Sequence, residues 1–84
     1  MTESLGEIRA ALDEVSERLR TAYECAGSAH RRLAEAVALL TELGRSYQDG
    51  LVPPELARAT EELSRGLGLI SGGADAVAAI ETRL

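Results

Sequence analysis

The chain has 84 residues and a formal net charge of −5, and only two of its residues, Tyr23 and Tyr47, are aromatic. This length allows one domain with a modest core, and the scarcity of aromatic side chains disfavours an enzyme or a ligand pocket. Acidic and basic residues are interleaved, which argues against a nucleic-acid partner. We therefore predict a single domain over residues 1–84 that is not an enzyme and has no catalytic residues.

A single cysteine, Cys25, indicates a reducing compartment, because one thiol cannot form an intramolecular disulfide. No apolar run reaches membrane-spanning length, and the first residues lack the basic-then-apolar order of a secretory signal. These features predict a soluble cytoplasmic protein with no membrane partner, and they leave export without a signal open.

Residues 4–48 carry an apolar heptad pattern that is typical of one long helix packed along a seam. Ser4 and Glu7 have the spacing of a capping box at its start, while Gly44 and then Asp49-Gly50 mark its end. Such a helix is about 60 Å long, which favours a coiled coil over a small globule. The first heptad position is occupied by Leu5, Leu12, Leu19, Ala26, Leu33, Leu40 and Tyr47, and the companion position by Ile8, Val15, Ala22, Ala29, Ala36 and Leu43.

Residues 54–84 repeat the pattern after a turn. Pro53-Pro54 can open a helix, because the first helical residue needs no N–H donor. Two such helices joined by a short turn predict an all-α antiparallel helical hairpin. The first heptad position is occupied here by Leu56, Leu63, Ile70, Val77 and Leu84, and the companion position by Ala59, Gly66, Gly73 and Ile80.

Four glycines lie inside the second predicted helix. If the hairpin folds at its turn, residue numbers across the seam sum to 102 or 103, so Ala36 faces Gly66 and Ala29 faces Gly73. We interpret Ala29, Ala36, Gly66 and Gly73 as a close-packed part of the seam. The second helix is expected to be continuous, since the heptad pattern keeps its phase through the glycines. A break at residues 71–73 is the alternative. A phosphate-binding loop is disfavoured, because it needs a further glycine and a preceding strand.

The two predicted helices differ in length, which leaves apolar side chains uncovered. Pairing Leu84 with Leu19 places four apolar residues of the first helix beyond the end of the second, and the middle of the first helix is apolar on its flanks as well. Both features predict that two hairpins associate into a four-helix bundle. The alternatives are a monomer that bends back and a different protein that covers the stripe. The predicted dimer or partner interface comprises Leu5, Ile8, Leu12, Val15, Tyr23, Val37 and Leu39.

Few residues suit metal or cofactor chemistry. Cys25 and His30 project to different sides of a helix, and the sequence contains no Glu-x-x-His pair, so we predict no metal and no cofactor. Cys25 is expected to be a small apolar contact or, under oxidation, a link to another copy. The basic cluster at residues 30–32 is interpreted as a solvated face, with docking to an acidic partner as the alternative. The hairpin tip, with Tyr47 and Asp49, is a further candidate for partner recognition.

An acidic, Ala- and Leu-rich helical hairpin of this size resembles the WXG100 group of small secreted or secretion-associated proteins, in which a long helix, a short turn and a second helix form a dimeric bundle. The resemblance covers architecture alone: the turn reads YQDGLVPPEL in place of Trp-x-Gly, and no functional residues are transferred. The sequence thus predicts a non-enzymatic assembly or adaptor protein that acts through coiled-coil contacts with itself and with another protein. The alternative is a small regulatory partner, such as an antitoxin-like or anti-activator protein, that caps an apolar groove of another protein.

Overall fold

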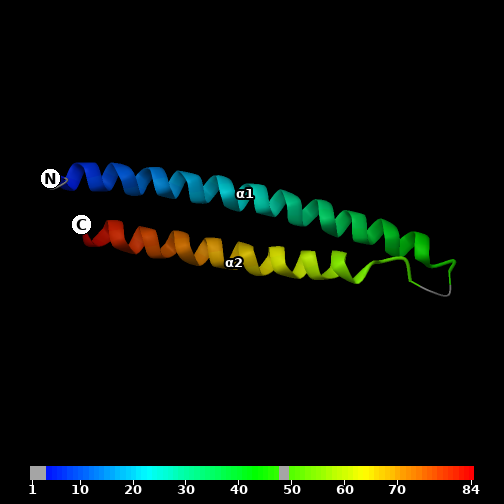
Figure 1. Cartoon of the computed structure of the whole chain (residues 1–84). Coiled ribbons are helices and arrows are strands. Elements are labelled where there is room, and N and C mark those ends of the chain that lie inside the picture. The colour runs from blue at the N-terminus through cyan, green and yellow to red at the C-terminus, as the bar shows by residue number, and fades with distance from the viewer. Residues whose placement is uncertain (1–3, 48–49) are drawn as a thin grey trace.

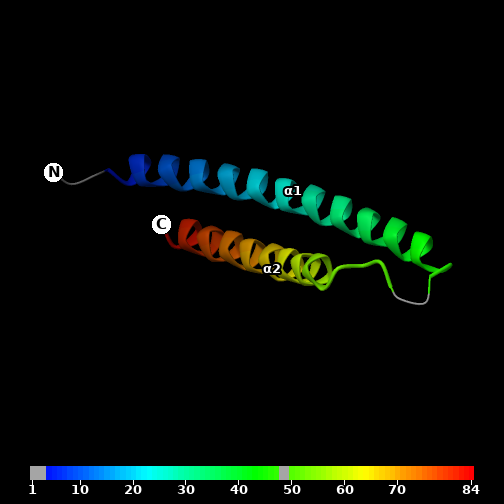
Figure 2. The same ribbon diagram turned by 45° about the vertical axis from the view of Figure 1, so that its right-hand side comes forward.

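The computed structural model describes residues 4–47 and 50–84, which form two antiparallel α-helices (Figure 1). Helix α1 spans Leu5–Gly44 and helix α2 spans Pro54–Arg83. The start of α1 and the end of α2 lie at one end of the molecule, and the turn lies at the other (Figure 2). The predicted all-α antiparallel hairpin is therefore confirmed.

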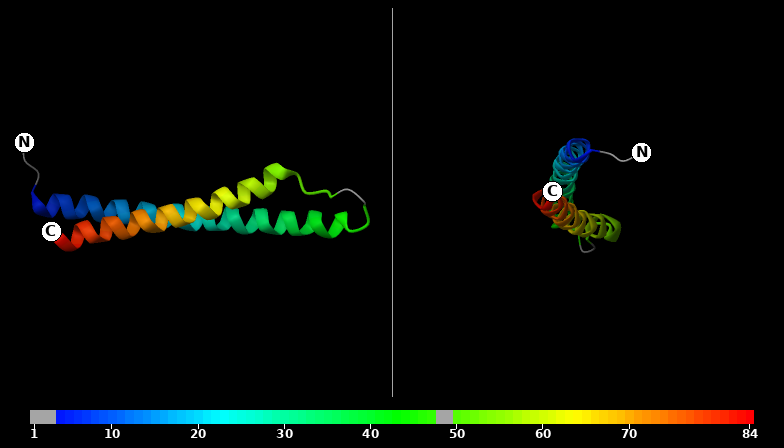
Figure 3. Two further views of the ribbon diagram at one scale, coloured as in Figure 1. Left: turned by 90° about the horizontal axis from the view of Figure 1, so that it is seen from below. Right: turned by 90° about the vertical axis from the view of Figure 1, so that its left-hand side faces the viewer.

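The hairpin is long and thin. Its principal extents are 66 × 21 × 14 Å and its radius of gyration is 19.3 Å, whereas a compact domain of this length has a radius of gyration of about 12 Å. Figure 3 shows that α2 is inclined to α1, so the two helices cross at a shallow angle. With only one neighbour, each helix leaves most of its circumference facing outwards.

The start of α1 has the predicted N-cap. Ser4 adopts an extended backbone, its Oγ accepts a hydrogen bond from Glu7 N at 3.1 Å, and its carbonyl accepts one from Ile8 N at 3.1 Å. The hydroxyl thereby satisfies one of the donors that the first helical turn leaves without an intrahelical partner.

Replacing Ser4 with alanine is expected to destabilise the protein by about 1 kcal/mol, because the Glu7 N–H loses its acceptor. In thermal unfolding followed by circular dichroism, the melting temperature should fall by several degrees. Ser64→Ala is the matched control: Ser64 is exposed inside α2, so its replacement improves helix propensity and should raise the melting temperature slightly. Equal responses of the two variants would contradict the capping role of Ser4.

Helix α1 ends at Gly44, four residues before the predicted end at residue 48. Arg45 N donates to Glu42 O at 3.4 Å, and Tyr47 N donates to Gly44 O at 3.0 Å, so the chain leaves the helix through a tightened last turn. Leu51 then returns against the helix end: a Cβ added to Gly44 would lie 3.4 Å from Leu51 N. The missing side chain at Gly44 lets the turn fold closely onto α1.

Helix α2 begins at Pro54, where the missing N–H removes no intrahelical bond, and Leu56 N donates to Pro53 O at 3.0 Å. The helix continues without interruption to Arg83. The predicted continuous helix is therefore confirmed, and the alternative break at residues 71–73 is wrong. Each of the four glycines inside α2 costs about 1 kcal/mol relative to alanine, so the helix forms against its local preference there.

The register between the helices differs from the prediction. Ser16 Oγ donates a hydrogen bond to Glu81 Oε1 at 3.2 Å, and 16 and 81 sum to 97 rather than to 102 or 103. The reason is the earlier end of α1, because antiparallel pairing is centred on the turn. Moving that end from residue 48 to Gly44 lowers the sum by four, and the observed helix ends Gly44 and Pro54 sum to 98.

The first heptad position forms the seam, as predicted. All of these residues within the overlap of the two helices are half-buried. They are Leu12, Leu19, Ala26, Leu33 and Leu40 on α1, and Leu56, Leu63, Ile70 and Val77 on α2, followed by Leu84.

The second row that is half-buried along most of the seam is not the predicted companion row, which is half-buried only at Ile8, Ala29, Ala36, Ala59 and Gly66. The observed second row lies four residues after the first heptad position instead of three. Its residues on this side are bulkier, for example Val37 and Leu67 in place of Ala36 and Gly66, so packing on this flank buries more apolar area. The half-buried members are Ser16, His30, Val37 and Gly44 on α1, and Thr60, Leu67, Ala74 and Glu81 on α2.

Candidate functional site

Neither α1 nor α2 contains a fully buried residue. The chain exposes 6589 Å², whereas a compact monomer of 8.9 kDa exposes about 4,800 Å². The surplus is about 1,800 Å² per chain. A single hairpin therefore covers only part of the apolar surface that its sequence carries.

The uncovered apolar residues form two rows, one on each helix. They lie three residues after or one residue before the seam leucines, on the flank that the partner helix does not cover. We call these rows together the open apolar face. Its members are Val15, Ala22, Cys25, Ala29, Ala36, Leu39 and Leu43 on α1, and Ala59, Gly66, Leu69, Gly73, Ala76 and Ile80 on α2; of these, Ala29, Ala36, Ala59 and Gly66 are half-buried at the edge of the seam and the rest are exposed.

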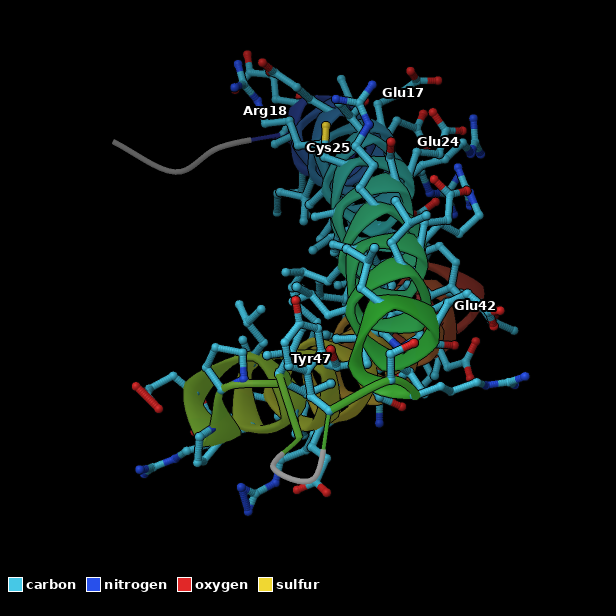
Figure 4. The ribbon with its side chains drawn as sticks, turned by 90° about the vertical axis from the view of Figure 1, so that its right-hand side faces the viewer. Glu17, Arg18, Glu24, Cys25, Glu42 and Tyr47 are labelled. Atoms are coloured by element: carbon cyan, nitrogen blue, oxygen red, sulfur yellow. The ribbon has the colours of Figure 1, made fainter. Side chains whose placement is uncertain are left out.

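Both rows project to the same side of the hairpin. Seen down the long axis of the hairpin, successive residues wind clockwise around one helix and anticlockwise around the other, because the helices are antiparallel. The seam rows of the two helices face each other. Rows with the same offset from the seam therefore point the same way. In Figure 4, Glu24 and Glu42 point to the right of α1, whereas Cys25 lies at the top of that helix and Tyr47 lies low, near the turn.

The open apolar face contains the most exposed leucines of the described chain. Leu69 is 71% exposed, Leu39 66% and Leu43 62%, while Val15 and Ile80 at the far end are 41% and 39% exposed. Cys25 is exposed as well. Large side chains gathered on one side of a monomer mark an interaction surface, because scattered apolar residues would not line up in this way.

Charged side chains lie around this face and also within its rows: Arg18 and Arg32 on α1 and Glu62 on α2 each stand one residue before a seam leucine. The ion pairs among the described residues join side chains three or four positions apart and are strongly exposed, as in Glu14–Arg18 at 2.8 Å and Arg58–Glu62 at 3.3 Å. Such pairs add only a few tenths of a kcal/mol each to helix stability. At the rim of the face, α2 contributes Glu55 near its start and Arg83 at its end.

The predicted overhang of α1 is much shorter than expected. With the observed register, Leu84 lies level with residue 13 rather than with Leu19. Ile8 and Leu12 are half-buried, and Leu5 is 50% exposed beyond the end of α2. The overhang was derived from the later end of α1, so it shrinks for the same reason that the register changes.

The predicted flanking set is divided between two sides of α1. Leu39 and the overhang residue Val15 belong to the open apolar face. Tyr23, which is 46% exposed, and half-buried Val37 lie on the other flank, next to the seam with α2. The sequence analysis missed Leu43, Leu69 and Ile80 as members of an interaction surface, although the seven-residue spacing of Leu69 and Ala76 was a signal for it.

The predicted close packing of Ala29 and Ala36 against Gly66 and Gly73 stays a prediction, and the two glycines have open space beside them in the hairpin. A Cβ added to Gly66 or Gly73 would meet no heavy atom within 4 Å, apart from its own helix backbone. The shifted register and the choice of flank leave Gly73 exposed, whereas Ala29, Ala36 and Gly66 are half-buried at the edge of the seam. At the hairpin tip, Tyr47 is 65% exposed, and Asp49 lies outside the described residues.

The described residues contain no group of three or more His, Cys, Asp or Glu side chains placed to hold a metal ion, and no buried polar side-chain atom without a hydrogen bond. The hollows between the helices are open grooves on the flank away from the open apolar face, lined for example by Ser16, Tyr23 and Ala74. In the same described part, no helix is both long and apolar enough to cross a membrane.

Comparison of the chain with protein-family models, with curated proteins and with solved structures gave no match. The assignment of a function therefore depends on the geometry of the hairpin and on its open apolar face.

Proposed function

We propose that this chain is a non-enzymatic assembly or adaptor module that works through helix–helix contacts, first of all with another copy of itself. The observation that carries this proposal is the open apolar face, which is contributed by both helices and left uncovered by the hairpin. Because no described residue is fully buried, such a surface is the main source of further stabilisation.

The area supports self-association. A standard protein–protein interface buries about 800 Å² on each partner, and the surplus of this chain over a compact monomer is about 1,800 Å². A second hairpin can therefore cover a standard interface and complete a four-helix bundle. An adaptor would use the same face to bind a different protein. A chain that stays monomeric by itself and gains helicity only when that protein is added would indicate this role.

The test is the dependence of thermal unfolding on protein concentration. If the folded state is a dimer, a hundredfold rise in concentration stabilises it by about 2.7 kcal/mol, which corresponds to a rise in melting temperature of about 8 °C for two chains of this length. Circular dichroism at 222 nm measures the transition. A melting temperature that is independent of concentration would contradict self-association.

A further inference from the structure

We propose that the second copy docks onto the open apolar face with its turn at the opposite end, so that Leu69 of each chain fits between Gly66 and Gly73 of the other. This inference rests on the proposed self-association. It adds the docking surface, the relative orientation of the two chains and the central contact of the dimer. An experiment can contradict each of these three claims without contradicting self-association.

The row of the face that lies three residues after the seam is arranged almost symmetrically from end to end, whereas the row one residue before the seam also carries Arg18, Arg32 and Glu62. A two-fold rotation about a point between Leu69 and Ile70 of α2 places Gly66 of one chain opposite Gly73 of the other, and Ala59 opposite Ile80. A two-fold symmetric dimer requires this kind of self-complementary surface.

The row on α1 has its centre at Ala29, and turning it around that residue places Val15 opposite Leu43 and Ala22 opposite Ala36. The two centres lie at nearly the same level of the hairpin, because 29 and 69 sum to 98 and the observed register is 97. One two-fold axis across the middle of the face therefore serves both helices, with α1 against α1 and α2 against α2.

The glycines of α2 fall into two pairs with different surroundings. Gly66 and Gly73 lie on the open apolar face on either side of Leu69, whereas Gly68 and Gly72 lie on the far side of the helix. None of the four is required by contacts within the hairpin. Gly66 and Gly73 leave a notch on either side of the most exposed leucine, and a second α2 helix can insert its own Leu69 there as a knob into a hole.

The charges at the rim favour this orientation. Glu55 and Arg83 belong to the same helical row as Leu69, and turning α2 end for end brings Glu55 of one chain opposite Arg83 of the other at both ends. Hairpins with their turns at the same end would stack α1 over α2 instead. By the register, Arg83 lies level with residue 14 and Glu62 with residue 35, so that arrangement would bring Arg18 close to Arg83 of the other chain, a like-charge contact, and Arg32 close to Glu62, an opposite-charge contact. These two contacts offset each other, and the Glu55–Arg83 pairing is what favours turns at opposite ends.

The first experiment compares the variant Gly66→Ala/Gly73→Ala with the control variant Gly68→Ala/Gly72→Ala. Both gain the same helix propensity, so a surface without a partner would give the same rise in melting temperature, about 10 °C. If the notch receives Leu69, the control variant should melt higher than the unmodified chain, and the face variant should melt lower and dimerise at least about tenfold more weakly. Equal rises for both variants would overturn the notch.

The second experiment tests the orientation by disulfide formation in a Cys25→Ser background. Ala29→Cys places a thiol at the two-fold axis, so mild oxidation should link the two chains rapidly. Ala38→Cys, on an outer face, should link them much more slowly. Slow linking of both variants, in a protein that sediments as a dimer, would overturn the proposed orientation while leaving self-association intact. A protein that sediments as a monomer would overturn the proposed function itself.

Discussion

Replacing Leu39 and Leu69 with glutamate is expected to abolish self-association. Both side chains are about two-thirds exposed or more in the hairpin, so in a monomer the change would be close to neutral or would improve solubility. In a two-fold dimer each substitution is present twice, and losing four leucine contacts at about 1.5 kcal/mol each weakens dimerisation by about 6 kcal/mol, or about 10⁴-fold.

The readouts are molar mass and helicity at one fixed concentration. Glutamate and leucine have similar helix propensities, so a loss of helicity in this variant would result from loss of the second chain. Such a loss would support the proposed dimer as much as a fall in molar mass would. The control is Ala38→Glu/Ala79→Glu, which adds the same charge to exposed positions off the face. Unchanged mass and melting temperature in the Leu39→Glu/Leu69→Glu variant would exclude this surface.

Replacing Leu63 with aspartate is expected to unfold the hairpin at ordinary concentrations. Leu63 is half-buried in the middle of the seam, where the two helices of one chain meet. The variant loses apolar burial and brings a carboxylate next to apolar side chains, and the combined cost is about 3 kcal/mol or more. That is a large share of the stability of a domain of this size.

The matched control for this change is Ser64→Asp, at the neighbouring exposed position. It introduces the same charge and the same low helix propensity, so it should lower the melting temperature by only a few degrees. Far-UV circular dichroism should show the helical signal lost at 25 °C in Leu63→Asp and retained in Ser64→Asp. Two variants with the same melting temperature would show that the seam does not hold the hairpin together.

Local signals in the sequence were sufficient for the helices themselves. Ser4 and Glu7 defined the start of α1, Pro54 defined the start of α2, and the heptad phase carried α2 through its glycines. These features depend on neighbouring residues, so the sequence alone contains the physics that decides them.

The register and the choice of flank could not be obtained in the same way. Where α1 ends depends on Leu51 folding back onto Gly44, which is a contact between residues on opposite sides of the turn. Since α1 is apolar on both flanks, its pattern is compatible with α2 on either side, and packing around Val37 and Leu67 decides between them. An error of four residues at the helix end was therefore enough to shift the register and to overestimate the overhang of α1.

The most direct test of the central claim is sedimentation equilibrium of the unmodified chain across about a hundredfold range of concentration. We expect the molar mass to approach twice the 8.9 kDa of a single chain as concentration rises, with helicity rising or staying full alongside it. A fully helical protein whose mass stays at 8.9 kDa throughout would contradict the account, because the open apolar face would then be stable in water without a partner.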